Sequence, residues 1–223
     1  MDALAHNFFN LEVMGRYWPQ VWAGFWLTVG LAVLVVLAGL ALGLGLAVIR
    51  AFQWRVLNWG IVFFVDLFRA LPPIVVVIIF YFAFPYVNIQ MSGFVATWLT
   101  LTLVLAAFSE EIFWAGITAV ERGQWEAARS TGLSFFQTLR DVVILQAIRM
   151  TIPPLTNRTI AITKGTAIGS VVAVQEILNQ ASSAQAQAAN PSPLTLGALA
   201  YLLLFLPVVI ASRWVESRFA WKR

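Results

Sequence analysis

Apolar residues are concentrated in five long runs, separated by shorter polar segments. A helix that spans a membrane needs about 20 mainly apolar residues, and every run reaches that length. The pattern therefore predicts an all-α membrane protein with five transmembrane helices. Their expected bounds are Val21–Ile49, Ile61–Tyr86, Phe94–Val120, Pro153–Ile177 and Leu194–Trp214. Pro72-Pro73 interrupts the second run, and the fourth run is the most polar.

The composition supports this interpretation. Of 223 residues, 61% are hydrophobic and 11% are charged, whereas soluble domains carry about 25% charged residues. We expect a single transmembrane domain over residues 1–223 with no separate soluble domain. The first run is far longer than the roughly 7–15 apolar residues of a cleaved signal peptide, so we expect it to be a retained span.

Lysine and arginine predict the orientation, because they accumulate in cytoplasmic loops. They follow the first run, separate the third run from the fourth, and follow the fifth run, whereas the loops Val87–Gly93 and Leu178–Pro193 contain none and only Arg16 lies on the other side. We therefore expect the N-terminus outside and the C-terminus in the cytoplasm. The basic residues are Arg50, Arg55, Arg122, Arg129, Arg140, Arg149, Arg213, Arg218, Lys222 and Arg223.

The cytoplasmic segment at residues 121–150, called the polar insert below, contains signals for two short helices. Gln124–Thr131 consists of good helix formers and ends at Gly132, a common helix stop. Ser134 followed by Gln137 fits a capping box that starts a second helix, and we expect Pro153-Pro154 to end or kink that helix. On these residues alone, the insert could lie on lipid or could bind a cytoplasmic subunit.

Ionisable residues inside the spans are candidates for function, because burying charge in lipid is costly. Lys164 lies about 16 Å along the helix from Pro153, at a rise of roughly 1.5 Å per residue. It could bind a substrate carboxylate or form a structural ion pair, and we expect the structural pair. The adjacent acids Glu110 and Glu111 need compensation, which Lys164, Arg149 or Arg69 could supply.

Other polar and small residues suggest packing roles or a substrate path. Asp66 and Arg69 stand three residues apart and could pair on one helix face. Thr163, Thr166 and Ser170 make the fourth span the most polar wall, and could line a path or join helices. Gly39, Gly43 and Gly45 could form a small-residue packing face. Asn179–Pro193 is expected to be an uncharged external loop, either a connector or a landing site for a partner.

A spaced motif in the polar insert resembles the EAA loop of ABC importer permeases. The motif is Glu126-Ala127-Ala128, three residues, Gly132, nine residues, then Val142, Ile144 and Leu145. The family pattern is EAA, three residues, G, nine residues, I, any residue, L, P. Leu145 replaces the proline, and Pro153-Pro154 could supply the missing bend.

The surrounding segments are similar to polar amino-acid permeases of the histidine/glutamine type. FRALP at 68–72 is similar to their FRGTP, and KGTAI at 164–168 to their KDTSL. Residues 110–134 (EEIFWAGITAVERGQWEAARSTGLS) are similar to AEIFRGGI…KGQWEAARALGLS, with Trp114 in place of an arginine. Residues 146–157 (QAIRMTIPPLTN) are similar to QALRRTIPPLTN.

This resemblance implies a type I ABC importer (MetI-like) permease of the bacterial inner membrane whose insert couples to a separate ATPase. Glu126 would make the polar contact, Ala127 and Ala128 would allow close approach, and Gly132 would permit the turn. The implied ATPase-coupling residues are Gly123, Gln124, Glu126, Ala127, Ala128 and Gly132, and the implied path or gate residues are Lys164, Thr163, Thr166, Glu111 and Arg69. The implied partners are ABC ATPase subunits, a second permease subunit (the same chain or a sister), an extracytoplasmic solute-binding protein, a polar amino acid and membrane lipid.

Several activities are not expected of this chain. A P-loop needs Gly-Lys before Ser or Thr, but Lys164 and Lys222 follow Thr163 and Trp221, so ATP and Mg²⁺ would bind the ATPase partner. The chain has no cysteine and one histidine, so we expect no catalytic residues, no metal site and no nucleic-acid partner. The alternative function is a membrane scaffold that anchors a cytoplasmic protein without transport.

Overall fold

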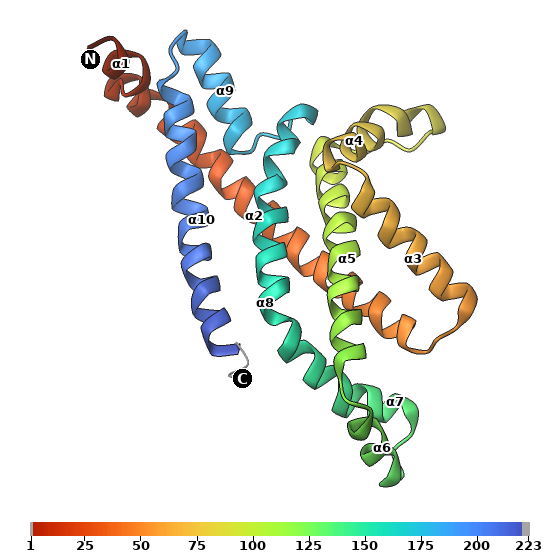
Figure 1. Ribbon diagram of the computed structural model, residues 1–223. Coiled ribbons are helices and arrows are strands. Elements are labelled where there is room, and N and C mark those ends of the chain that lie inside the picture. The colour runs from red at the N-terminus through yellow and green to blue at the C-terminus, as the bar shows by residue number, and fades with distance from the viewer. Residues whose placement is uncertain (1, 220–223) are drawn as a thin grey trace.

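The computed structural model describes residues 2–219, and every regular element in this range is helical (Figure 1). The α-helices are α1 (Asp2–Phe8), α2 (Leu11–Ala51), α3 (Arg55–Ala70), α4 (Pro73–Ile78), α5 (Gly93–Ala119), α6 (Arg122–Ser130), α7 (Phe135–Thr138), α8 (Ile144–Thr163), α9 (Ile177–Ala188) and α10 (Ser192–Phe219). Two π-helical segments, η1 (Ile79–Ala83) and η3 (Leu139–Val143), and two 3-10 segments, η2 (Phe84–Val87) and η4 (Lys164–Val172), continue them.

The described residues contain three helices that are long and apolar enough to cross a membrane: His6–Ala51, Gly93–Ala119 and Ser192–Val215. Two further spans arise if each of two bent helix pairs is counted as one span. The bend is 101° between α3 and the segment Pro73–Val87, and 45° between Phe135–Val172 and α9. The span count is therefore three to five by length and composition, and the predicted five is its upper limit.

The first span is longer than predicted, since α2 extends over 41 residues. It crosses the molecule obliquely in Figure 1, from the end beside α9 and α10 to the start of α3. Two predicted packing glycines lie against α5: a Cβ at Gly39 would lie 2.8 Å from Leu105, and one at Gly43 would lie 2.6 Å from the Cβ of Ser109. Gly45 is different, because no described atom lies within 4 Å of its Cβ position.

The second predicted span bends sharply where its sequence contains Pro72-Pro73. Leu71 ends α3 in an extended conformation (φ −81°, ψ 131°), as expected for a residue that precedes proline. The chain then turns, and α4 runs across the end of α5 (Figure 1). The apolar run therefore forms two helices in different directions.

Pro153 and Pro154 were predicted to end or kink the helix, and the first of these alternatives is wrong, because the helix continues through both prolines. Both prolines lie inside α8, which starts earlier at Ile144 and continues directly from η3. Membrane helices tolerate proline where neighbouring helices and Ser or Thr side chains compensate the backbone. The hydroxyl of Thr156 donates to the Ile152 carbonyl at 2.8 Å in this region.

The predicted loop conformation of Asn179–Pro193 is also wrong for most of the segment, because α9 continues to Ala188. Ile177, Ala181 and Ala184 are fully buried or nearly so, and their spacing places them on one helix face. That face packs against α2 and α10. The small alanine side chains explain why this helix lacks the strong apolar stripe that hydropathy detects.

Candidate functional site

The polar insert folds as two short helices joined by a turn at Gly132. Gly132 adopts φ +91°, a conformation that residues with a Cβ rarely adopt. The predicted capping box is confirmed: Gln137 N donates to the Ser134 hydroxyl at 3.3 Å, and Ser134 N donates to the Gln137 side chain at 2.9 Å. The sequence therefore defines both the stop of α6 and the start of α7.

One face of the insert is fixed against the ends of α2 and α5. The ring of Phe135 lies 5.4 Å from that of Phe52 and 5.5 Å from that of Trp125. Leu139 and Val143 are fully buried in the same cluster. This packing makes the insert a rigid continuation of the helices and gives it a fixed orientation.

The other face of the insert is open. Gly123, Gln124, Glu126 and Ala127 are exposed, whereas Ala128 is turned inward and buried. The two alanines of the motif therefore differ, and Ala127 is the one that a partner could approach. Further along, the exposed Arg140 guanidinium donates to Asp141 at 2.6 Å and lowers the pKa of that carboxyl.

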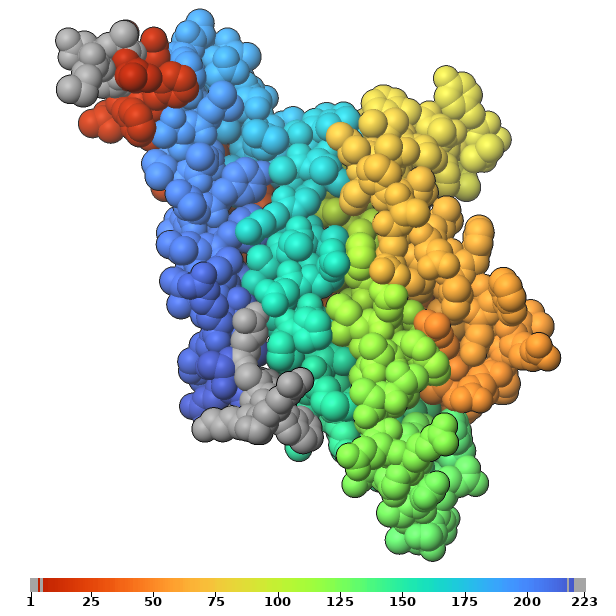
Figure 2. All heavy atoms as spheres, in the orientation of Figure 1, coloured from red at the N-terminus to blue at the C-terminus, as the bar shows by residue number. Residues whose placement is uncertain are grey.

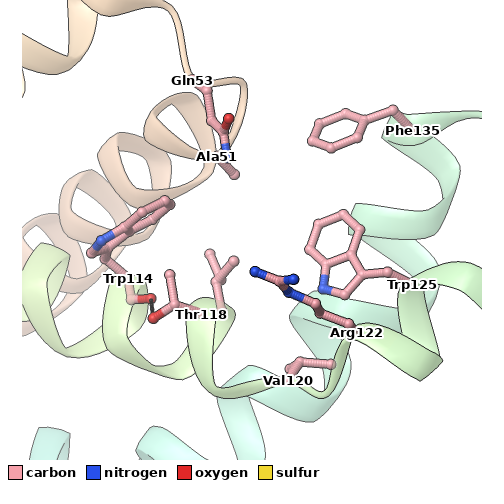
Figure 3. A pocket seen from close by; sticks show the side chains of 9 residues that line it. Ala51, Gln53, Trp114, Thr118, Val120, Arg122, Trp125 and Phe135 are labelled. Atoms are coloured by element: carbon pink, nitrogen blue, oxygen red, sulfur yellow. Dashed lines mark hydrogen bonds between the residues drawn. The ribbon is translucent and has the colours of Figure 1, made fainter.

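A cavity of about 440 Å³ lies between the insert and the ends of α2 and α5. Figure 3 shows Trp114, Ala51 and Gln53 on one side, Trp125 and Phe135 on the other, and the Arg122 guanidinium reaching into the space between them. The cavity separates the insert from the body of the helices on this side.

Glu110 pairs with Arg50, and this overturns the predicted pairing of Lys164 with Glu110 or Glu111. Arg50 Nη1 lies 3.0 Å from Glu110 Oε1, and the Glu110 side chain is fully buried. The close approach at Gly43, whose Cβ position is 3.0 Å from the Glu110 amide nitrogen, brings the end of α2 alongside Glu110. Arg50 also lies 4.7 Å from the Trp114 ring centre.

Glu111 pairs with Arg69, which was one of the three predicted partners of these acids, at 2.7 Å between Oε1 and Nη1. The predicted pair of Asp66 with Arg69 is therefore also wrong. The α3–α5 packing brings Arg69 to α5, whereas Asp66 is exposed. Both partners of the observed pair are partly exposed, with side-chain exposures of 35% for Arg69 and 47% for Glu111.

Lys164 lies at a groove of about 630 Å³ between the start of η4 and α10. Figure 2 shows α10 and α8 side by side on one face of the molecule, with α5 and α3 beyond them. Tyr201, Phe205 and Leu206 form part of the apolar wall. Lys164 is exposed, and it makes no ion pair with any side chain that the structure describes.

Thr163 and Thr166 are buried, and their hydroxyls donate to carbonyls of their own helix. Thr163 bonds to Thr159 and Thr166 to Thr163, each at 2.9 Å. The predicted path residues are therefore not gathered at one point. Lys164 faces α10, whereas Arg69 and Glu111 connect α3 to α5.

Two further charged positions were missed by the sequence analysis. Arg158 of α8 lies 3.8 Å from the ring centre of Phe108. Glu176, fully buried before α9, accepts from the Tyr201 hydroxyl at 2.5 Å and from the backbone of Leu178 and Asn179. Both could have been found as ionisable residues inside or next to the fourth span.

Comparison with known proteins identifies one matching family and several similar permeases. Residues 39–221 match the family described as "Binding-protein-dependent transport system inner membrane component". The chain is 34% identical to a probable amino-acid ABC transporter permease, YckA, of Bacillus subtilis, over 78% of this chain and 76% of that one. It is 30% identical to the probable glutamine permease GlnM of the same organism, over 94% and 97% of the two chains.

Two solved structures have the same fold. A crystal structure of an amino acid ABC transporter with histidines has a TM-score of 0.83 and 29% identity, over 92% of this chain and 96% of that chain. An inward-facing MetNI methionine ABC transporter has a TM-score of 0.67 and 19% identity, over 93% and 98% of the chains, and supports the fold alone.

Proposed function

The chain belongs to the family of binding-protein-dependent transport system inner membrane components, and we propose that it imports a polar amino acid or a related small zwitterion. It is the permease subunit of an ABC importer, as its relatives are. The observation that carries the substrate proposal is the similarity over almost the whole chain to permeases named for glutamine and other amino acids.

The polar insert is the proposed joint with the ATPase. Its exposed face offers Gly123, Gln124, Glu126 and Ala127, while its buried face is packed on α2 and α5. A rigid mount of this kind passes a movement of the ATPase directly to the helices. In this proposal Gly132 sets the turn, and Ala128 packs on the buried face of the insert.

The complex is proposed to contain two ATPase subunits, a second permease subunit and an extracytoplasmic binding protein. ATP and Mg²⁺ bind the ATPase subunits, and this chain is not an enzyme. In the bacterial inner membrane, the insert and the C-terminus face the cytoplasm and the N-terminus faces outside, in agreement with the distribution of arginine and lysine.

The proposed substrate path uses residues that remain accessible between helices. Lys164 lies at the groove between η4 and α10, and the partly exposed Arg69–Glu111 pair lies between α3 and α5. Thr163 and Thr166 support the helix around Lys164 through their backbone hydrogen bonds.

Transport can be tested in proteoliposomes that contain this chain, its ATPase and its binding protein. We expect ATP-dependent accumulation of a labelled amino acid, and we expect Glu126→Lys to abolish it and to weaken ATPase co-purification. Glu12→Lys is a matched control, because Glu12 is an exposed glutamate at the opposite end of the molecule. Binding of the ATPase without ATP-dependent uptake of any amino acid would favour a scaffold.

A further inference from the structure

Two arginine guanidinium groups lie against the ring of Phe108 in the middle of α5. The Arg158 guanidinium carbon lies 3.8 Å from the ring centre and that of Arg69 lies 5.5 Å from it. Glu111 is bound to Arg69 at 2.7 Å. About 16 Å of helix separates Phe108 from the end of α5 at Ala119, at a rise of roughly 1.5 Å per residue, so this cluster lies well inside the apolar layer.

The positive charges of this region are not balanced by the carboxylates that the structure describes. Arg50 and Glu110 form one neutral pair, and Arg69 and Glu111 form another. Glu176 is fully buried and is held by Tyr201 and two backbone amides. Arg158 and Lys164 remain, and neither makes an ion pair among the side chains that the structure describes.

Two uncompensated cations on one span are costly in lipid, and such residues usually face a path or pair with another charge. The Phe108 ring stabilises the Arg158 guanidinium on one side by a cation–π contact. Among the described residues, no hydrogen bond or ion pair uses the donor groups of this guanidinium. Arginine presents these donors in a planar fork that matches a carboxylate. An anion is therefore the ligand that the chemistry of this position favours.

We infer that the imported molecule is an amino acid with a second acidic group, and that Arg158 beside Phe108 binds one of its anionic groups in the membrane. This inference rests on the proposed function and narrows its substrate class. Glu111 is 47% exposed, so its carboxylate can also accept the ammonium group of the substrate. Lys164, six residues along the chain from Arg158, faces the groove beside α10 and is not part of this site.

The test uses the complex of this chain with its ATPase and its binding protein in proteoliposomes. Uptake of labelled L-glutamate, L-aspartate, L-glutamine and L-arginine is compared at equal concentrations. We expect ATP-dependent uptake of an acidic amino acid to exceed that of the neutral and basic ones. Arg158→Gln should lower that uptake by at least thirtyfold, as expected for the loss of one partner of a desolvated charge pair.

Matched variants separate binding from folding. Arg55→Gln removes the same charge at the exposed start of α3 and should leave uptake unchanged, whereas Arg158→Lys should retain part of it. The affinity of the binding protein for the substrate should be the same with every variant. If Arg158→Gln does not assemble, binding of labelled L-glutamate and L-glutamine to the wild-type permease–ATPase complex decides the question, because this measurement needs neither the variant nor transport.

Several results would overturn the inference. Preferred uptake or binding of glutamine or arginine would show that the substrate is not acidic. Wild-type uptake of glutamate by Arg158→Gln would show that Arg158 does not bind it. Failure of the proposed function looks different, because then no amino acid of any charge is accumulated with ATP, while preferential binding of L-glutamate to the complex still reports on the charge of the site.

Discussion

Arg50 Nη1 lies 3.0 and 3.2 Å from the two carboxylate oxygens of Glu110, and so joins the last turn of α2 to α5. The Glu110 side chain is fully buried and that of Arg50 is 20% exposed. Removing one partner of a buried pair costs about 3–5 kcal/mol, because the other charge is left uncompensated. The pair therefore fixes how the end of α2 meets the helix that leads into the polar insert.

Arg50→Met is expected to lower the free energy of unfolding by about 3–5 kcal/mol, and a second change, Glu110→Gln, should recover most of this loss. The measurement is the thermal unfolding of the purified protein in detergent. Arg16→Met is the control, because the side chains of its pair with Glu12 are 70% and 86% exposed and exposed pairs contribute roughly 0–1 kcal/mol. Equal losses for the two arginine variants would contradict the structural role of Arg50.

The close packing of α2 on α5 predicts opposite results for two neighbouring glycines. A Cβ at Gly43 would lie 2.6 Å from the Cβ of Ser109, so Gly43→Ala should destabilise by about 1–3 kcal/mol through overpacking. Gly45→Ala meets open space and should be neutral or more stable by up to about 1 kcal/mol, since alanine favours helix. Thermal unfolding of both variants checks the difference, and similar values would be evidence against this helix contact.

The parts of the fold that the sequence predicts well are those with local causes. The apolar runs locate the long helices, the Ser134–Gln137 capping box locates the start of α7, and Gly132 locates the turn before it. The prediction was wrong where a long-range contact decides the result. Arg50 and Glu110 are 60 residues apart in the sequence, and no local pattern indicates that the Gly43 contact brings them together.

Local composition also gives the wrong secondary structure for α9 and for the proline pair of α8. The α9 segment has mostly alanine, serine and glutamine, and its burial depends on α2 and α10. The prolines of α8 suggested a break, but packing of the surrounding helices supports a continuous helix there. Arg158 lies inside the predicted fourth span, and no local pattern indicates the ring of Phe108 that it contacts on α5.

The turn at Gly132 predicts a specific coupling defect. Gly132→Ala forces a Cβ into a backbone conformation with φ +91°, at a cost of about 1–3 kcal/mol. We expect the exposed face of the insert to shift, so that ATPase co-purification and uptake fall together while the long helices still form. Gly60→Ala is the control outside the insert, because Gly60 is not among the described residues with positive φ and open space surrounds it. Normal coupling in Gly132→Ala would argue against the insert as the joint.

The orientation can be tested with single cysteines, because the chain has none of its own. Ser182 on α9 and Ser130 at the end of α6 are both exposed. In right-side-out vesicles, an impermeant thiol reagent should label Ser182→Cys and should leave Ser130→Cys unlabelled until the membrane is opened. The opposite labelling pattern would reverse the predicted topology.

Lys164 is the remaining charge whose role the ion pairs do not explain. Since Glu110 binds Arg50 and Glu111 binds Arg69, Lys164→Met should leave stability close to that of the wild type, and Glu111→Gln should not act as a rescue. A contact of the lysine with the substrate carboxylate would make Lys164→Met lower uptake by roughly thirtyfold or more, for a loss of about 2 kcal/mol. Lys164→Arg keeps the charge at the groove between η4 and α10 and should retain part of the uptake. Unchanged uptake in Lys164→Met would mean that the ammonium group only extends toward water and that the substrate passes elsewhere.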